Sequence, residues 1–126
     1  GRVMIAAAQA TAGLRCVGVE YDKTFYDRAQ KAIDEGGLGE MVEARHGDAL
    51  EVPLDDATAV FVYLVPKGLK LVAPALKDVL RRPGTRIVSY LFSVPGLTPA
   101  TFKEYKSTKV YLYDATSLPV EDGAAP

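Results

Sequence analysis

The stretch Cys16-Val17-Gly18-Val19-Glu20-Tyr21-Asp22 is a short apolar run that ends in an acidic residue and gives way to a helical pattern. Such a run is typical of a strand that is buried on both faces and whose carboxyl end opens into a crevice. In doubly wound sheets, an acid at the end of the second strand accepts hydrogen bonds from ribose hydroxyls. Glu20 is therefore a candidate binding residue, and the alternative is a solvated acid at a strand end.

The composition indicates one globular domain without a strong charge field. The chain has 126 residues, of which 48% are apolar, and its net charge is -1, which gives no support to nucleic-acid binding. The single Cys16 rules out an internal disulfide and predicts an intracellular, reducing compartment, where this thiol acts as a core residue. The apolar runs are too short to predict membrane insertion.

The first ten residues are rich in alanine and favour a helix, but no capping residue or strand precedes them. We therefore expect the body of a helix that starts upstream, a first strand that is missing from this sequence, and a chain that is incomplete at its N-terminus. Gly13 is suited to a left-handed helix cap.

The next elements alternate between helix and strand. A strand over residues 15–20 precedes an amphipathic helix over residues 23–35, in which apolar side chains recur at a spacing of three to four. Residues 41–45 alternate as a second strand, and His46-Gly47-Asp48-Ala49 forms a turn at its carboxyl end. Asp48 thus follows the second strand as Glu20 ends the first.

The middle of the chain predicts the sheet's central strand. Residues 57–65 form an unbroken apolar and β-branched run, expected for a strand that helices cover on both faces, and Pro66 stops it. Residues 67–82 predict a helix that Pro74 should kink or divide. Another strand is expected over residues 85–91, followed by a loop.

The last part predicts an antiparallel hairpin. Residues 102–105 and 110–113 are short β-favouring runs with no helix between them, and residues 118–126 have the composition of a flexible tail. The resulting order predicts an α/β domain over residues 1–117, with a mostly parallel sheet and a C-terminal antiparallel hairpin. The tyrosines of the hairpin are expected to pack or to form a partner surface.

This arrangement resembles the class I S-adenosylmethionine-dependent methyltransferases, up to about Asp114. The resemblance implies a Rossmann-like, doubly wound sheet, and the sequence would retain only Gly1 of the family's glycine-rich loop. The sequence Gly-Arg-Val-x-Ile-Ala-Ala-Ala of residues 1–8 is similar to the corresponding segment of a subgroup in which the glycine-rich loop ends in Gly-Asp-Gly-Arg. That subgroup includes protein lysine methyltransferases similar to those that modify the ATP synthase c subunit.

The resemblance also implies roles for individual residues. Glu20 matches the acid that binds the ribose hydroxyls of S-adenosylmethionine, and Tyr21 lies where a side chain covers the adenine. Asp48 matches the acid near the adenine amino group, within the more specific tripeptide Gly47-Asp48-Ala49. We therefore expect Gly1, Glu20, Tyr21, Asp48 and Ala49 to bind the cofactor.

Residues 62–66 lie at the family's fourth motif, where the methyl group and the acceptor meet. The sequence Val-Tyr-Leu-Val-Pro departs there from the Asn-Pro-Pro-Tyr and Asp-Pro-Pro-Tyr forms of many amino-nitrogen methyltransferases, which disfavours a nucleic-acid base as substrate. We predict methyl transfer to a protein lysine, with Tyr63 and Pro66 forming the acceptor channel. The alternative for Tyr63 is packing beneath a helix.

Other interpretations remain open. His46 lacks an orienting acid or metal partners at recognisable spacing, which favours a structural role over that of a general base. A non-catalytic scaffold within a larger assembly is the alternative to an enzyme, because the cofactor's glycine-rich loop is not in the sequence. A nicotinamide-dependent oxidoreductase would share the acid at the strand end, although the hairpin counts against it.

Overall fold

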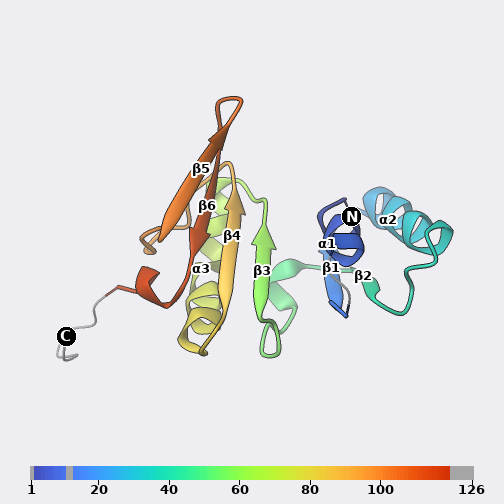
Figure 1. The fold of residues 1–126 in the computed structure, drawn as a ribbon, viewed down its shortest axis with the longest axis horizontal. Coiled ribbons are helices and arrows are strands. Elements are labelled where there is room, and N and C mark those ends of the chain that lie inside the picture. Colours follow the sequence, from blue (N-terminus) through green and yellow to red (C-terminus); the bar gives the residue numbers. More distant parts are fainter. Residues whose placement is uncertain (1, 11–12, 120–126) are drawn as a thin grey trace. The chain divides into compact units, whose positions relative to one another are not determined.

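The protein forms two compact units, residues 1–52 (unit 1) and residues 53–126 (unit 2). The computed structural model describes residues 2–10 and 13–119 (Figure 1). The helices are α1 (Arg2–Ala10), α2 (Lys23–Glu35) and α3 (Pro66–Arg81), with short 3-10 turns η1 (Ala49–Glu51) and η2 (Ala115–Ser117). The strands are β1 (Cys16–Glu20), β2 (Val42–His46), β3 (Ala59–Val62), β4 (Arg86–Tyr90), β5 (Thr101–Tyr105) and β6 (Thr108–Tyr113). This order confirms the predicted alternation of helices and strands.

Unit 1 pairs two parallel strands and connects them through α2. Strand β1 pairs with β2 so that Cys16 lies opposite Val42 and Glu20 opposite His46. Helix α2 begins where the Asp22 carboxylate accepts hydrogen bonds from the backbone amides of Thr24 and Phe25, at 2.8 and 3.2 Å. This cap satisfies two amide groups that the first turn of the helix leaves without partners.

The core of unit 1 is small. Ile33 of α2 and Val42 of β2 are its fully buried pair, and Cys16 packs against them while half-buried. The sequence predicts that β1 is buried on both faces, whereas Val17 is 42% exposed. The difference arises because β1 has one paired neighbour, β2, among the described residues of this unit.

Unit 2 is built on a four-stranded sheet in the order β3-β4-β6-β5. Strands β3 and β4 are parallel, whereas β6 runs antiparallel to both β4 and β5. The predicted central strand is therefore shorter than expected and occupies one end of this sheet. Phe61 of β3 is 41% exposed, so the expected cover on both faces is not found within unit 2.

Helix α3 lies along one face of the four-stranded sheet (Figure 1). Pro66 occupies its first turn, where a missing backbone N–H costs nothing, and Pro74 lies inside a helix that continues without division. The apolar side of α3 packs onto the sheet in one core. Its buried members include Leu69, Leu76 and Leu80 of α3, Ile87 of β4 and Tyr113 of β6.

Arg82 fixes the chain that enters β3. Its guanidinium donates hydrogen bonds to the backbone carbonyls of Leu54 at 2.6 Å and Ala57 at 2.8 Å, and also to that of Asp55. These bonds tie the end of α3 to the loop before β3. They give hydrogen-bond partners to three backbone carbonyl groups of an irregular segment, of which that of Leu54 also accepts from the amide of Ala57 at 3.2 Å.

The hairpin β5–β6 confirms the predicted antiparallel pairing, and its turn has an unusual backbone. Lys106 and Ser107 have φ values of 48° and 68°, in the left-handed region that a tight hairpin turn requires. After β6, η2 begins at Asp114, and Leu118 packs against the core of unit 2. The rest of the predicted tail, residues 120–126, lies outside the described residues, and the single domain over residues 1–117 stays a prediction.

Two further features concern the described residues as a whole. None of their helices has the length and apolar character needed to cross a membrane. No group of three or more His, Cys, Asp or Glu side chains gathers among them as a metal site would require.

Candidate functional site

Glu20 lies at the carboxyl end of β1, as the sequence predicts. One of its carboxylate oxygens, Oε1, accepts a hydrogen bond from the backbone amide of Asp22 at 3.2 Å. The Glu20 carbonyl accepts another from the amide of Gly47 at 3.0 Å, which links the ends of the two parallel strands. The side chain is partly buried, and no partner for its second oxygen is found among the described residues.

Asp48 follows β2 at the same edge of the two-stranded sheet, because β1 and β2 run parallel. Its Oδ1 accepts a hydrogen bond from the amide of Leu50 at 2.9 Å, so Asp48 caps the short turn that contains Ala49. The carboxylate of Asp48 is partly buried and Ala49 is exposed. Asp48 thus combines a local structural role with a second oxygen that can accept from a ligand.

Tyr21 and His46 lie beside this edge, and they differ in how many contacts their side chains make. Tyr21 is 78% exposed, so its ring is free to cover a bound group. The His46 Nε2 lies 3.1 Å from the Tyr21 carbonyl, which can only accept, so this nitrogen donates the bond. The His46 ring also packs on Tyr26 at 5.4 Å between centroids. These contacts support the structural interpretation of His46.

The second group of predicted site residues belongs to unit 2. Tyr63 follows β3 and is 59% exposed, so it does not pack beneath a helix of its unit. Its ring meets the ring of Tyr90 edge to face, with centroids 4.8 Å apart and planes at 69°. Pro66 begins α3 three residues after Tyr63 and is exposed. Gly1, the remaining predicted cofactor residue, lies outside the described residues.

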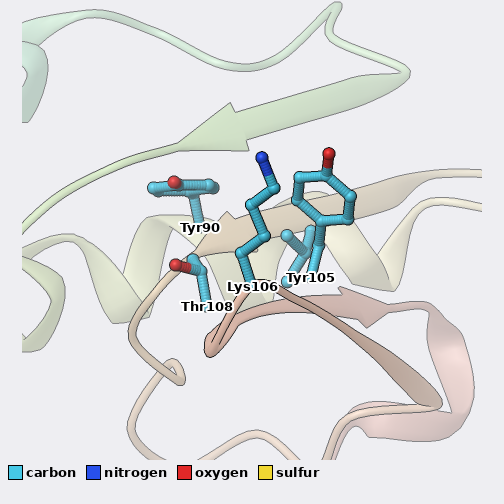
Figure 2. Close-up of a pocket in the computed structure, with 5 residues that line it drawn as sticks. Tyr90, Tyr105, Lys106 and Thr108 are labelled. Atoms are coloured by element: carbon cyan, nitrogen blue, oxygen red, sulfur yellow. The ribbon is translucent and has the colours of Figure 1, made fainter.

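Sequence reasoning missed Tyr90, which ends β4 next to β3 in the sheet. The signal was present, since Tyr90 stands at the carboxyl end of its strand as Tyr63 follows the end of β3. Tyr90 also lines a pocket of about 350 Å³ together with Tyr105, Lys106, Thr108 and Val110, here called the Lys106 pocket (Figure 2). Lys106 and Thr108 were likewise not singled out by the sequence.

The core of unit 2 holds a buried phenol, that of Tyr113. The hydroxyl of Tyr113 accepts a hydrogen bond from the backbone amide of Val94 at 2.8 Å. Burial raises the pKa of Tyr113 above its ordinary value of 10.0, although this hydrogen bond acts in the opposite direction. The bond ties the loop that follows β4 to Tyr113 of β6.

Comparison with known proteins identifies similar sequences and structures. A protein-lysine N-methyltransferase of Saccharolobus islandicus is 31% identical over 99 residues, which are 79% of this chain and 61% of that protein. The chain thus spans about three-fifths of the length of this curated relative. An RNA methyltransferase from Salinibacter ruber, solved with S-adenosyl-L-homocysteine, is 35% identical, with a TM-score of 0.81. That match covers 90% of this chain and 72% of the other.

More distant structures share the fold alone. The TrmK tRNA methyltransferase of B. subtilis is 15% identical, with a TM-score of 0.64 over 98% of this chain and 59% of the other. The Salinibacter ruber structure confirms the predicted Rossmann-like α/β fold class. The Saccharolobus islandicus and Salinibacter ruber matches, together with the family match described below, confirm the predicted resemblance to class I S-adenosylmethionine-dependent methyltransferases. They also confirm S-adenosylmethionine as the predicted cofactor.

A match to the model of a protein family identifies the family of this chain. The model of the ANTKMT methyltransferase domain matches residues 1–101, which include both strand-end acids, Tyr63 and Tyr90. This match gives no support to the oxidoreductase alternative. The chain belongs to the family of the ANTKMT methyltransferase domain.

Proposed function

We propose that the protein transfers the methyl group of S-adenosylmethionine to a lysine side chain of another protein. The observation that carries this proposal is the pair of carboxylates, Glu20 and Asp48, at the ends of two parallel strands within a methyltransferase domain. The lysine acceptor is supported by the name of the Saccharolobus islandicus relative. The activity, substrate and partners of the whole protein are part of the proposal.

The residues of unit 1 fit the adenosine part of the cofactor by their chemistry. A ribose diol donates two hydrogen bonds, and the second oxygen of Glu20 can accept one of them while Oε1 holds the Asp22 amide. An adenine amino group donates, and the second oxygen of Asp48 can accept from it. The exposed ring of Tyr21 can cover the base. S-adenosylmethionine, when bound, supplies an electrophilic methyl group on a sulfonium.

The residues of unit 2 suit a lysine acceptor. A lysine must lose its proton before it can attack a methyl group, and an apolar channel favours the neutral amine by desolvation. In this proposal the exposed ring of Tyr63 covers the apolar stem of the lysine, and its hydroxyl holds the amine. Tyr90 keeps the Tyr63 ring in position through their edge-to-face contact. Pro66 forms the wall beside them.

An RNA acceptor is the second candidate function. It is favoured by the structure of the Salinibacter ruber RNA methyltransferase, which is 35% identical to this chain. The chain's net charge of -1 counts against it, because RNA binding depends on cations that neutralise phosphates. A protein partner at the β5–β6 hairpin remains part of the favoured proposal.

Methyl transfer from radiolabelled S-adenosylmethionine tests these alternatives directly. The full-length protein should label a lysine-containing protein extract, and amino-acid analysis should recover methyl-lysine. Ribonuclease treatment should leave this signal unchanged. Label that disappears with ribonuclease and is recovered in nucleosides would support the RNA acceptor instead.

Calorimetry separates the enzyme from the scaffold alternative. The folded full-length protein should bind S-adenosylmethionine with a dissociation constant in the micromolar range, the order of magnitude usual for enzyme substrates. A folded sample that shows neither binding nor methyl transfer would support the non-catalytic scaffold. An intracellular, reducing compartment is also proposed, supported by the single Cys16 of the sequence.

A further inference from the structure

The Lys106 pocket lies on the sheet face that α3 leaves uncovered. Ile87 and Tyr113, which are paired across β4 and β6, are buried in the core with α3. Side chains alternate along a strand, so Tyr90 and its register partner Val110 lie on the opposite face. The pocket is therefore separate from the core of unit 2 and open to a ligand.

The turn that carries Lys106 has a backbone that a lysine rarely adopts. Residues with positive φ in two-residue hairpin turns are usually glycine or asparagine. Lys106 has a φ of 48°, and Ser107 follows with a φ of 68°. A residue other than glycine in this region costs on the order of 1 kcal/mol, and such costs are found most often at functional sites. Figure 2 shows the Lys106 side chain extending between the rings of Tyr90 and Tyr105.

The ammonium group of Lys106 has an aromatic contact. Its Nζ lies 5.4 Å from the centroid of the Tyr105 ring. Among residues 2–10 and 13–119, no carboxylate lies within ion-pair distance of this nitrogen. Lys109 of the same hairpin differs, because it lies opposite Glu104 in the register of β5 and β6. The Lys106 cation is thus held at a pocket where no carboxylate of the described residues pairs with it.

We propose that the Lys106 pocket binds the carboxylate of an aspartate or glutamate that lies near the methylated lysine of a protein substrate. This inference rests on the proposed function. Tyr90 carries the connection, because its ring lines the pocket and also contacts Tyr63 of the predicted acceptor channel. An acidic side chain bound at Lys106 therefore holds a neighbouring lysine of the same peptide beside Tyr63.

The polar and apolar groups that line the pocket favour an acidic side chain as its ligand. The Lys106 ammonium supplies a charge-assisted hydrogen bond, and the hydroxyl of Thr108 supplies a second donor. Val110 and the tyrosine rings offer apolar surface to the methylene groups of a glutamate. A second lysine would meet the like charge of Lys106, which disfavours it there.

A phosphate of a nucleic acid is the competing ligand, and the observations favour it less. Binding to a nucleic-acid backbone depends on several cations that neutralise successive phosphates. The pocket offers one, and the chain has a net charge of -1. Lys103 is exposed on β5 without lining the pocket, which makes it the matched control for a charge on the same hairpin.

Fluorescence anisotropy with the full-length protein tests the proposal. The probes are two labelled decapeptides with one central lysine, which carry glutamates or glutamines at two positions on each side. The glutamate peptide should bind about tenfold more tightly, the factor expected for one charge-assisted hydrogen bond. Lys106→Gln should abolish this preference, whereas Lys103→Gln should retain it. Circular dichroism of both variants establishes that they are folded.

The possible outcomes separate this proposal from the proposed function. Equal affinity for both peptides, or a preference that survives Lys106→Gln, would overturn the pocket's role even if lysine methylation is observed. A preference that depends on Lys106 supports the pocket even if no methyl group is transferred, in which case the proposed function fails alone. Binding of an oligouridine probe that is lost in Lys106→Gln, without any peptide preference, would assign the pocket to nucleic-acid phosphate.

Discussion

The two units of the protein differ in how much core supports their candidate sites. Among the described residues of unit 1, the buried cluster is one apolar pair, Ile33 of α2 and Val42 of β2. Among the described residues of unit 2, ten buried apolar residues form one core around α3 and the sheet. A larger core makes a unit more stable on its own, because stability grows with the apolar area removed from water. Glu20 and Asp48 therefore belong to the unit with the smaller core.

The two units also differ in what their strand ends present. Parallel strands in unit 1 end in acids that also hold backbone amides, namely Glu20 and Asp48. The parallel strands of unit 2 lead to aromatic rings that contact each other, those of Tyr63 and Tyr90. Polar donors of a cofactor match the first set, and an apolar acceptor stem matches the second. The same strand geometry thus carries two kinds of chemistry.

The largest effect is expected from a core substitution that tests the difference in core size between the two units. Leu76 of α3 is 1% exposed, and Leu76→Ala should reduce the free energy of unfolding by about 3 kcal/mol, the usual cost of such a cavity. Ile33→Ala in unit 1 should cost less, about 2 kcal/mol, because its small cluster can relax around the change. Urea unfolding measures both. Leu71→Ala on the exposed side of α3 is the control, and equal costs for Leu76 and Ile33 would contradict the comparison.

A smaller effect is expected at the strand end of unit 1. Glu20→Ala should weaken S-adenosylmethionine binding by about 2 kcal/mol, because it removes a charge-assisted acceptor of the ribose hydroxyls. Calorimetry on the full-length protein measures the change. Glu40→Ala, which removes an exposed carboxylate elsewhere in unit 1, should leave affinity unchanged. If Glu20→Ala binds as tightly as the wild type, Glu20 is only a solvated strand-end acid.

The order of elements was predictable from local signals. The amphipathic spacing in residues 23–35 defines α2, and the helix has those bounds in the structure. The burial of β1 and β3 was not predictable in the same way. An apolar run shows that a strand is suited to burial, but the neighbours that cover it depend on contacts between distant segments. Val17 and Phe61 are exposed within their units for this reason.

The candidate site was predictable where a motif places a residue at a strand end. Glu20 and Asp48 were found in this way, and family resemblance gave them specific roles that stay predictions. Tyr90 was missed because no recognisable motif surrounds the end of β4, and its contact with Tyr63 depends on the pairing of β3 with β4. Lys106 was missed because its significance depends on a positive φ and on the pocket that it lines, neither of which the sequence pattern for a hairpin specifies.

The role of the aromatic rings is tested by removing one hydroxyl. Tyr63→Phe should reduce turnover about tenfold and leave cofactor affinity unchanged, because it removes a single hydrogen bond to the acceptor amine. Single-turnover methylation of a lysine peptide and calorimetry provide the two measurements. Tyr26→Phe, which removes the hydroxyl from a ring that packs on His46 and has no proposed role with the acceptor, is the matched control for turnover. Normal turnover in Tyr63→Phe would reduce Tyr63 to a packing partner of Tyr90.

The smallest effect is expected from a substitution inside the larger core, which is that of unit 2. Tyr113→Phe leaves the Val94 amide without its acceptor and should cost about 1 kcal/mol of unfolding free energy at pH 7. Burial raises the pKa of Tyr113 above 10.0, so its contribution is fully present below pH 10 and is lost as pH rises through the folded pKa. The wild type should therefore lose stability above pH 10 more steeply than Tyr113→Phe. Urea unfolding at several alkaline pH values measures this difference, and parallel losses in both proteins would show that the Tyr113 hydroxyl ionises as readily in the folded core as in the unfolded chain.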